Sequence, residues 1–315
     1  MTAAVPSTAL FHDVERAVGS VVRGNPAAVR LSLATILAGG HLLLEDVPGV
    51  GKTTLARALS RVLGVGFGRV QFTADLLPSD LVGIPILDAK EGVLRFKKGP
   101  IFTHLVLADE INRASPKTQS ALLEAMADRS VSVDDTTWEL PRPFHVIATQ
   151  NPIEHHGAYP LPESQLDRFM VCLSLGYPPA DDERALIVAN RTSESELLGL
   201  SALLPADALL EAQRHVAGLT LNDTVAGYLL AIVTATRRHP EIELPCSPRG
   251  SLAWASLVRG LAFLEGRSFV LPDDVKATAA AVLGHRLGLR GAVGTTRART
   301  KAVLDEILSQ VPAPR

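Results

Sequence analysis

Asp46-Val47-Pro48-Gly49-Val50-Gly51-Lys52-Thr53 is the stretch that decides the fold of this 315-residue chain. It matches the phosphate-loop pattern G-x-x-x-x-G-K-[ST] except at its first position, where Asp46 replaces glycine. The apolar run Leu42-Leu43-Leu44 before it predicts a buried strand, and the segment from Lys52 to Leu63 predicts a helix. A glycine-rich turn between a strand and a helix directs backbone N–H groups at an anion. The stretch therefore predicts a nucleotide-binding α/β domain.

The side chains of this loop have separate expected roles. Lys52 supplies a point charge for the β- and γ-phosphates of ATP or ADP, and the Thr53 hydroxyl is a ligand for Mg²⁺. Aspartate adopts left-handed backbone geometry more readily than most residues, so we expect Asp46 to make the turn in that conformation, with its carboxylate directed away from the phosphates. The expected nucleotide-binding residues are Asp46, Val47, Pro48, Gly49, Val50, Gly51, Lys52, Thr53 and Thr54.

A pair of acidic residues supplies the carboxylates for holding Mg²⁺ and activating water, which the phosphate loop lacks. The apolar run from Leu105 to Ala108 reads as a strand, and Asp109-Glu110 follow at its carboxyl end. Ligands of parallel sheets bind at that edge. We expect Asp109 to hold Mg²⁺, directly or through water, and Glu110 to orient and deprotonate the attacking water.

The order of apolar segments predicts the architecture. Short apolar runs alternate with helix-like segments, which is typical of a mostly parallel sheet. A helical pattern from Phe11 to Ala38 precedes the first strand, and Ser115-Pro116 predict the start of a further helix. Two segments interrupt the alternation as β-hairpins, Ile84 to Phe96 and Val131 to Leu140. The remaining predicted strands are Val70 to Phe72, Phe144 to Ala148 and Val171 to Leu175.

Strand patterns largely end at Tyr177-Pro178-Pro179, and helical periodicity such as that of Asp223 to Arg238 dominates afterwards. We therefore predict two domains, an α/β nucleotide-binding domain over residues 1–179 and a helical lid over residues 180–315. No fixed-period repeat is visible, which disfavours a solenoid.

Composition narrows the classes of partner and compartment. With 31 basic and 33 acidic residues the net charge is −2, so no overall positive charge favours nucleic acid or an anionic membrane surface. Cys172 and Cys246 are the only cysteines, which suits a reducing compartment and excludes a disulfide scaffold. The apolar run from Leu31 to Leu44 is too short and too interrupted to span a bilayer. We expect no membrane insertion and a cytoplasmic location.

The chain resembles the MoxR family of AAA+ ATPases over nearly its whole length. The residues that carry the resemblance follow the phosphate loop in several short stretches. They are Lys97-Lys98-Gly99-Pro100-Ile101-Phe102, Ala108-Asp109-Glu110-Ile111-Asn112-Arg113-Ala114, Ala148-Thr149-Gln150-Asn151-Pro152, Tyr159-Pro160-Leu161-Pro162-Glu163, Leu166-Asp167-Arg168-Phe169 and Ser247-Pro248-Arg249. The resemblance implies an AAA+ P-loop core with a five-stranded parallel sheet, two β-hairpin inserts and a C-terminal all-helical lid.

The resemblance also implies roles for three polar residues. Asn151 matches sensor 1, which positions the water or the γ-phosphate, although an Asn before Pro is often only a turn former. Arg168 resembles the arginine finger that reaches a neighbouring subunit's nucleotide, with a local ion pair to Asp167 or Glu163 as the alternative and Arg113 as a rival. Arg249 resembles sensor 2. It lies just after Ser247-Pro248, a predicted helix start where a cation opposes the helix dipole unless an anion is near.

We expect an ATP-hydrolysing, chaperone-like motor that assembles as a ring, by resemblance a hexamer, and acts on a protein client. MoxR-like ATPases commonly work with proteins that contain a von Willebrand factor A domain. Two alternatives remain open, a motor that translocates nucleic acid and a binding switch that hydrolyses almost no ATP. The few basic residues near the hairpins disfavour the first. The joint presence of Glu110, Asn151, Arg168 and Arg249 disfavours the second.

Overall fold

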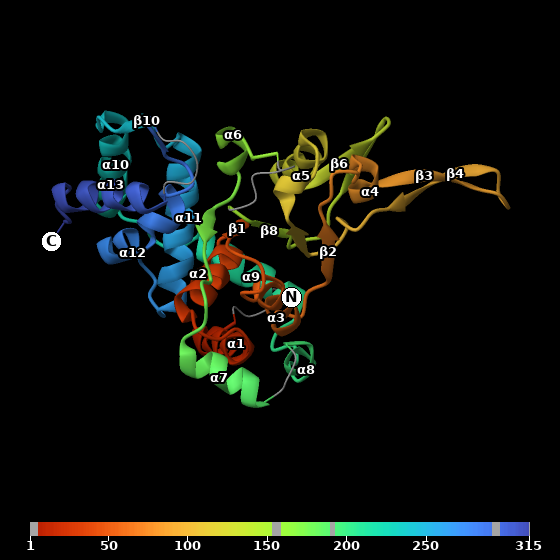
Figure 1. Cartoon of the computed structure of the whole chain (residues 1–315), viewed down its shortest axis with the longest axis horizontal. Helices are drawn as coiled ribbons and strands as arrows, with labels where there is room; N and C mark the ends of the chain where they lie inside the picture. Colours follow the sequence, from red (N-terminus) through yellow and green to blue (C-terminus); the bar gives the residue numbers. More distant parts are fainter. Residues whose placement is uncertain (1–5, 153–158, 190–192, 292–296, 315) are drawn as a thin grey trace.

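The computed structural model describes residues 6–152, 159–189, 193–291 and 297–314 (Figure 1). Five parallel strands form its main sheet in the order β2-β5-β8-β1-β9. They are β1 (Leu42–Glu45), β2 (Phe67–Gln71), β5 (Leu105–Asp109), β8 (His145–Gln150) and β9 (Val171–Leu173). The predicted five-stranded parallel sheet is confirmed. β1 lies between β8 and β9, so the phosphate loop leaves the sheet at an interior strand.

Helices cover both faces of this sheet. Successive side chains of a strand point to opposite faces, so neighbouring residues of one strand pack against different helices. Leu42 and Leu44 belong to the same apolar cluster as α1 (Thr8–Val21), α2 (Pro26–Leu37) and α3 (Lys52–Val62). Leu43 belongs to the cluster on the other face, which includes residues of α4 (Pro78–Val82) and α5 (Pro116–Asp128). The strand residues are therefore apolar on both sides, as expected for a buried parallel sheet.

The helical pattern predicted from Phe11 to Ala38 corresponds to two helices. α1 ends at Val21 and α2 starts at Pro26. Gly24 has a positive φ of 94°, and the Asn25 side chain accepts the backbone N–H of Ala28 as an N-cap. Proline at the first helical position then fixes the start of the second helix. Helical periodicity continued across this turn and concealed it.

Both predicted hairpins are present. The first consists of β3 (Gly83–Asp88) and β4 (Val93–Lys98), and Figure 1 shows it extending away from the body of the protein. The second consists of β6 (Ser130–Val133) and β7 (Thr136–Glu139). The rings of Phe96 and Trp138 stack at 4.7 Å between centroids, so the two hairpins contact each other near the base of the first.

The C-terminal region is helical, with one exception to the all-helical expectation. Its helices are α7 (Ala180–Ala189), α8 (Ser193–Leu198), α9 (Ala206–Ala217), α10 (Asp223–Arg238), α11 (Pro248–Leu264), α12 (Pro272–Leu283) and α13 (Arg297–Gln310). The exception is an antiparallel pair of β10 (Ile242–Leu244) and β11 (Gly288–Leu289), too short for any periodicity to reveal. Within the described ranges, none of the helices has the length and apolar run needed to cross a bilayer.

The lid is packed tightly against the core. A Cβ at Gly260 of α11 would lie 2.5 Å from the carbonyl oxygen of Ala34 in α2, so these helices approach each other at backbone distance. Residues of α9 to α13 belong to the same apolar cluster as Leu42 and Leu44. The lid and the sheet therefore share a hydrophobic core.

Candidate functional site

The phosphate loop curls around the ammonium group of Lys52. Gly49 and Gly51 have φ angles of 87° and 97°, a conformation that glycine adopts without the steric cost of a side chain. Gly51 is also the N-cap residue of α3, so the loop ends where backbone N–H groups begin to point along the helix axis. Lys52 Nζ donates to the carbonyl oxygens of Asp46 at 2.6 Å and Val47 at 3.1 Å. The loop thus has the backbone geometry of an anion site.

The backbone conformation of Asp46 differs from the one predicted. Of the described non-glycine residues, those with positive φ are Glu110, Arg129 and Asp134, so the expected left-handed turn at Asp46 is wrong. The two glycines make the turn instead. The expected direction of the carboxylate is correct, because it accepts hydrogen bonds from the Ser174 hydroxyl at 2.9 Å and the Gly176 amide at 2.8 Å, beyond the end of β9.

These contacts determine the charge state of Asp46. Burial by itself raises the pKa of the carboxyl, but hydrogen bonds from the Gly176 amide, the Ser174 hydroxyl and the Val47 amide outweigh burial and leave the pKa below its ordinary value. Asp46 is therefore an anion at neutral pH that ties the start of the phosphate loop to the segment after β9.

Asp109 lies at the carboxyl end of β5 and is held by two neighbouring strands. Thr149 of β8 donates its hydroxyl to Asp109 Oδ1 at 2.6 Å. Arg69 of β2 donates to Asp109 Oδ2 from Nη2 at 2.8 Å and from Nε at 3.2 Å. Both carboxylate oxygens are thus oriented before any ligand arrives, which reduces the reorganisation needed when a ligand binds.

Glu110 adopts a left-handed backbone conformation with φ of 57° and ψ of 49°. Such geometry at a non-glycine residue costs on the order of 1 to 3 kcal/mol and is maintained only by surrounding contacts. Its amide donates to the Thr149 hydroxyl at 2.9 Å. Its Oε2 accepts Gln71 Nε2 at 2.7 Å and Arg113 Nη1 at 2.9 Å. Glu110 is therefore positioned by three residues on three different elements.

A cavity of about 290 Å³ brings the phosphate loop and the acidic pair together. Asn151, which follows β8, reaches the same cavity because β8 pairs directly with β1. The lining residues are Pro48, Gly49, Gly51, Lys52, Thr53, Thr54, Asp109, Glu110, Thr149, Gln150 and Asn151. Asp46, Val47 and Val50 do not line it. The arrangement unites a phosphate cradle with groups suited to holding a metal and activating water.

The other two predicted site residues lie elsewhere. Arg168 does not form an ion pair with Asp167 or Glu163. Its Nη1 instead donates to the Leu123 carbonyl oxygen of α5 at 2.6 Å. Arg249 is exposed in the first turn of α11, whose predicted start at Ser247-Pro248 is confirmed. Neither arginine lines the cavity of its own chain. By contrast, the rival Arg113 contacts Glu110 beside that cavity.

Comparison with known proteins agrees with this arrangement. Residues 41–171 match the model of the ATPase family associated with various cellular activities (AAA), and residues 234–307 match the AAA lid domain. The chain is 38% identical to Chaperone MoxR1 of Mycobacterium tuberculosis, over 96% of this chain and 83% of that protein. The chain belongs to the MoxR family of AAA+ ATPases. It binds nucleotide and hydrolyses ATP.

Two further relatives share almost its full length. The protein YeaC of Bacillus subtilis is 44% identical over 94% of this chain and 92% of its own. A crystal structure from Cytophaga hutchinsonii, 34% identical, superimposes with a TM-score of 0.87 over 98% of this chain and 96% of that one. The MoxR-type architecture therefore extends through both the sheet and the lid.

The oxygen ligands in the cavity fit Mg²⁺. Thr53 and Asp109 both line it, and hydroxyl and carboxylate oxygens are ligands that this ion prefers. The described residues contain no cluster of three or more His, Cys, Asp or Glu side chains able to hold a metal. A site that offers Mg²⁺ only one or two protein ligands relies on nucleotide phosphates for others, as is usual for this ion. The bound ion would neutralise charge on the phosphates.

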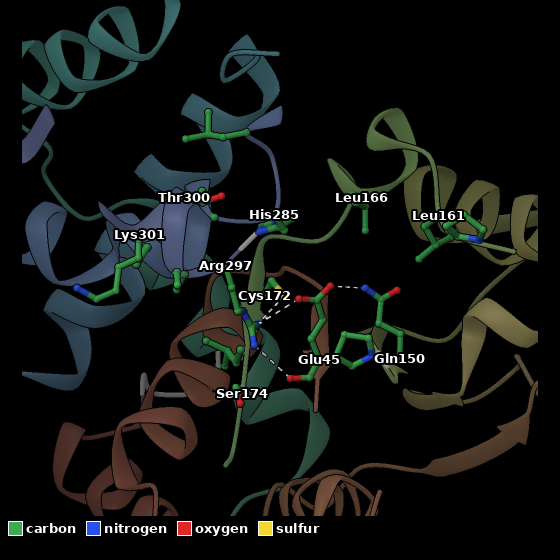
Figure 2. Close-up of a pocket in the computed structure, with 18 of the residues that line it drawn as sticks. Glu45, Gln150, Leu161, Leu166, Cys172, Ser174, His285, Arg297, Thr300 and Lys301 are labelled. Carbon is green, nitrogen blue, oxygen red and sulfur yellow. Dashed lines mark hydrogen bonds and ion pairs between the residues drawn. The ribbon is translucent and has the colours of Figure 1, made fainter. Parts of the chain in front are cut away.

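A second cavity, of about 960 Å³, lies between the sheet and helices α12 and α13 (Figure 2). Figure 2 shows Glu45 between Arg297 and Gln150. Arg297 Nη2 lies 3.3 Å from Glu45 Oε2, and Gln150 donates to the other oxygen of the same carboxylate. Burial, and then the charge of Glu45, raise the pKa of the Cys172 thiol in this cavity well above its ordinary value. A thiol with a raised pKa is mostly protonated at neutral pH, and the protonated form is a poor nucleophile.

Three residues that contact Asp109 or Glu110 were not singled out from the sequence, namely Arg69, Gln71 and Thr149. Thr149 lies within the matched stretch Ala148 to Pro152 and could have been suspected there. Arg69 and Gln71 are two positions apart on β2, so their side chains lie on one face of that strand. Only the pairing of β2 with β5 shows that this face contacts Asp109 and Glu110.

Proposed function

We propose that this MoxR-type ATPase works as a ring in which hydrolysis requires residues of two adjacent subunits, and that it uses the resulting motion to remodel a protein client. The ring is supported by the separation of the predicted site residues into a group that lines one cavity and two arginines that do not. The phosphate loop, Asp109, Glu110 and Asn151 share one cavity, whereas Arg168 and Arg249 lie outside it. A second copy of the chain would supply the missing positive charges.

Each group then has a role in the proposed mechanism. Lys52 and the loop amides bind the phosphates, and Thr53 with Asp109 holds Mg²⁺. Glu110 accepts the proton of the attacking water, and Asn151 orients that water or the γ-phosphate. Arg168 of the neighbouring chain stabilises the charge that develops in the transition state. Arg249 would contact the γ-phosphate of the neighbouring chain's nucleotide from the lid, since it does not line the cavity of its own chain.

Mixing two inactive variants tests the shared site. Arg168→Ala keeps Glu110 and should bind ATP normally but hydrolyse it slowly, while Glu110→Gln keeps Arg168 and should also bind ATP without hydrolysis. In mixed rings, some interfaces combine an intact Glu110 with an intact Arg168. We expect the mixture to exceed the mean rate of the two variants several-fold. A mixture no faster than that mean would show that Arg168 acts within its own chain, or not at all.

We propose that the client is a protein, and that a protein with a von Willebrand factor A domain assists, on the strength of the family resemblance. A pull-down with Glu110→Gln in ATP, compared with the same variant in ADP, tests this. Proteins enriched only with ATP would be expected, and enrichment of DNA or RNA instead would contradict a protein client. The exposed apolar pair Leu87 and Leu94, at 65% and 70% exposure near the tip of the first hairpin, is available for such contacts.

The division between residues 179 and 180 is also a proposal. It is supported by the end of the main sheet at β9, just before that point. The shared apolar cluster implies that the two parts unfold together. Cytoplasmic location remains a prediction from composition.

A further inference from the structure

A buried arginine in the lid has every donor occupied. Arg286, after α12, is 4% exposed. Its Nε donates to Asp167 Oδ1 at 2.8 Å, and its Nη2 donates to the carbonyl oxygens of Phe169 at 2.6 Å and Asp167 at 3.3 Å. Its Nη1 donates to the carbonyl oxygen of Met170 at 3.1 Å and to that of Val282. These contacts use all five guanidinium hydrogens. Four of them go to residues 167–170, the segment that contains Arg168.

The same arginine supports the start of α11. A Cβ at Gly250 would lie 3.0 Å from Arg286 Cδ and 3.1 Å from its Nε, so the guanidinium packs directly beneath the first turn of that helix. The second oxygen of Asp167 accepts the Ser247 hydroxyl at 2.9 Å. Ser247 is the N-cap of α11, and its Oγ accepts the Gly250 amide at 3.0 Å. Arg249 lies in this turn.

We propose that Arg286, Asp167 and Ser247 form a latch that holds Arg168 and Arg249 in a fixed relation, so that both arginines are presented together to a neighbouring subunit's nucleotide. The inference rests on the proposed function, in which both arginines act across the interface. Arg286, Asp167 and Ser247 are positioning residues, because none of them lines the nucleotide cavity.

The directionality of hydrogen bonds explains why buried Arg286, paired with the partly buried Asp167, serves this purpose. An apolar contact is non-directional and would let the lid slide against residues 167–170. A guanidinium with five directed hydrogen bonds instead fixes the position and the orientation of that segment relative to the lid. Separating the two segments would break the four hydrogen bonds that Arg286 donates to residues 167–170, so these bonds restrain their relative position. A shift of about 1 Å at a catalytic group can lower a rate about 100-fold.

A double-mutant cycle in the full chain tests the latch. Asp167→Asn keeps the size of the side chain and removes its charge. We expect its kcat to fall at least about tenfold, with KM for ATP within about twofold. In an Arg168→Ala/Arg249→Ala background, measured with radiolabelled ATP, Asp167→Asn should lower the remaining rate by less than about twofold, because the groups it positions are gone. Equal losses in both backgrounds would overturn the latch.

Two helix caps provide a matched comparison. Ser247→Ala removes the N-cap of α11 and its bond to Asp167, and Ser247→Thr retains a hydroxyl. Asn222 caps α10 of the same lid by accepting the Val225 amide at 2.8 Å, far from either arginine in sequence. Both Ser247→Ala and Asn222→Ala should lower the melting temperature, Ser247→Ala somewhat more because it also removes the bond to Asp167. Only Ser247→Ala should reduce kcat, about fivefold or more, with recovery in Ser247→Thr. Equal kcat values in Ser247→Ala and Asn222→Ala would overturn the latch.

The interface roles of the two arginines and the latch can be separated by experiment. If Arg168→Ala and Arg249→Ala each keep the full kcat, the interface roles of the proposed function are wrong and the latch falls with them. If those variants are slow but Asp167→Asn acts equally in both backgrounds, only the latch is wrong.

Discussion

Replacing Asp46 with glycine would restore the phosphate-loop pattern and should nevertheless destabilise the protein. The Asp46 carboxylate accepts hydrogen bonds from the Ser174 hydroxyl at 2.9 Å and the Gly176 amide at 2.8 Å. Hydrogen bonds to a charged group contribute about 1.5 kcal/mol or more each, and a new glycine adds about 0.5 to 1 kcal/mol of backbone entropy cost. We expect Asp46→Gly to lose about 3.5 to 4 kcal/mol of unfolding free energy or more at pH 7.

The assay is urea denaturation of the parent, Asp46→Gly and Asp46→Asn, with nucleotide affinity measured by calorimetry. Asparagine keeps an acceptor without the charge, so Asp46→Asn should lose about half as much stability as Asp46→Gly. Because the Asp46 side chain does not line the nucleotide cavity, affinity should stay within about threefold in both variants. If Asp46→Gly is as stable as the parent, or loses tenfold in affinity at unchanged stability, the Asp46 carboxylate does not stabilise the fold through these contacts.

The contribution of Asp46 to the unfolding free energy should also depend on pH. The pKa of Asp46 is below its ordinary value in the folded protein. Its contribution to stability is therefore fully present above the unfolded pKa, about 3.9, and is lost as the pH falls through the folded pKa. The stability difference between the parent and Asp46→Gly should shrink in that acidic range.

Three further outcomes are expected. Lys52→Ala should bind ATP at least about tenfold more weakly by calorimetry, since it loses a charge-assisted contact. Glu110→Gln should retain ATP affinity while phosphate release slows about 100-fold or more, and an unchanged rate would exclude Glu110 as the base. Burial lowers the pKa of His41 to about 3 and the pKa of His145 to about 4, whereas unfolded histidines titrate near about 6.5. The unfolded chain then binds more protons than the folded chain in this range. As the pH falls from about 6 to about 4, the unfolding free energy should therefore fall by about 1.4 kcal/mol per pH unit for each histidine. His145→Gln should remove one such contribution.

Local signals determined much of the fold. Strand and helix order, both hairpins, and the helix starts at Ser115 and Ser247 followed from periodicity and capping residues. Such features depend on neighbours within a few positions, which the sequence displays directly. A local preference failed where the tertiary structure supplied another solution, as in the left-handed turn expected of Asp46.

By itself, the sequence determined that a phosphate cradle and an acidic pair exist and that each ends a strand. The tertiary structure decided which distant groups hold them: Arg69 and Thr149 on Asp109, Ser174 on Asp46, and Arg286 on Asp167. The reason is that a strand or a cap is fixed by residues close in the chain. A side-chain contact between residues 40 to 128 positions apart depends on strand order, register and helix packing, which no short pattern encodes.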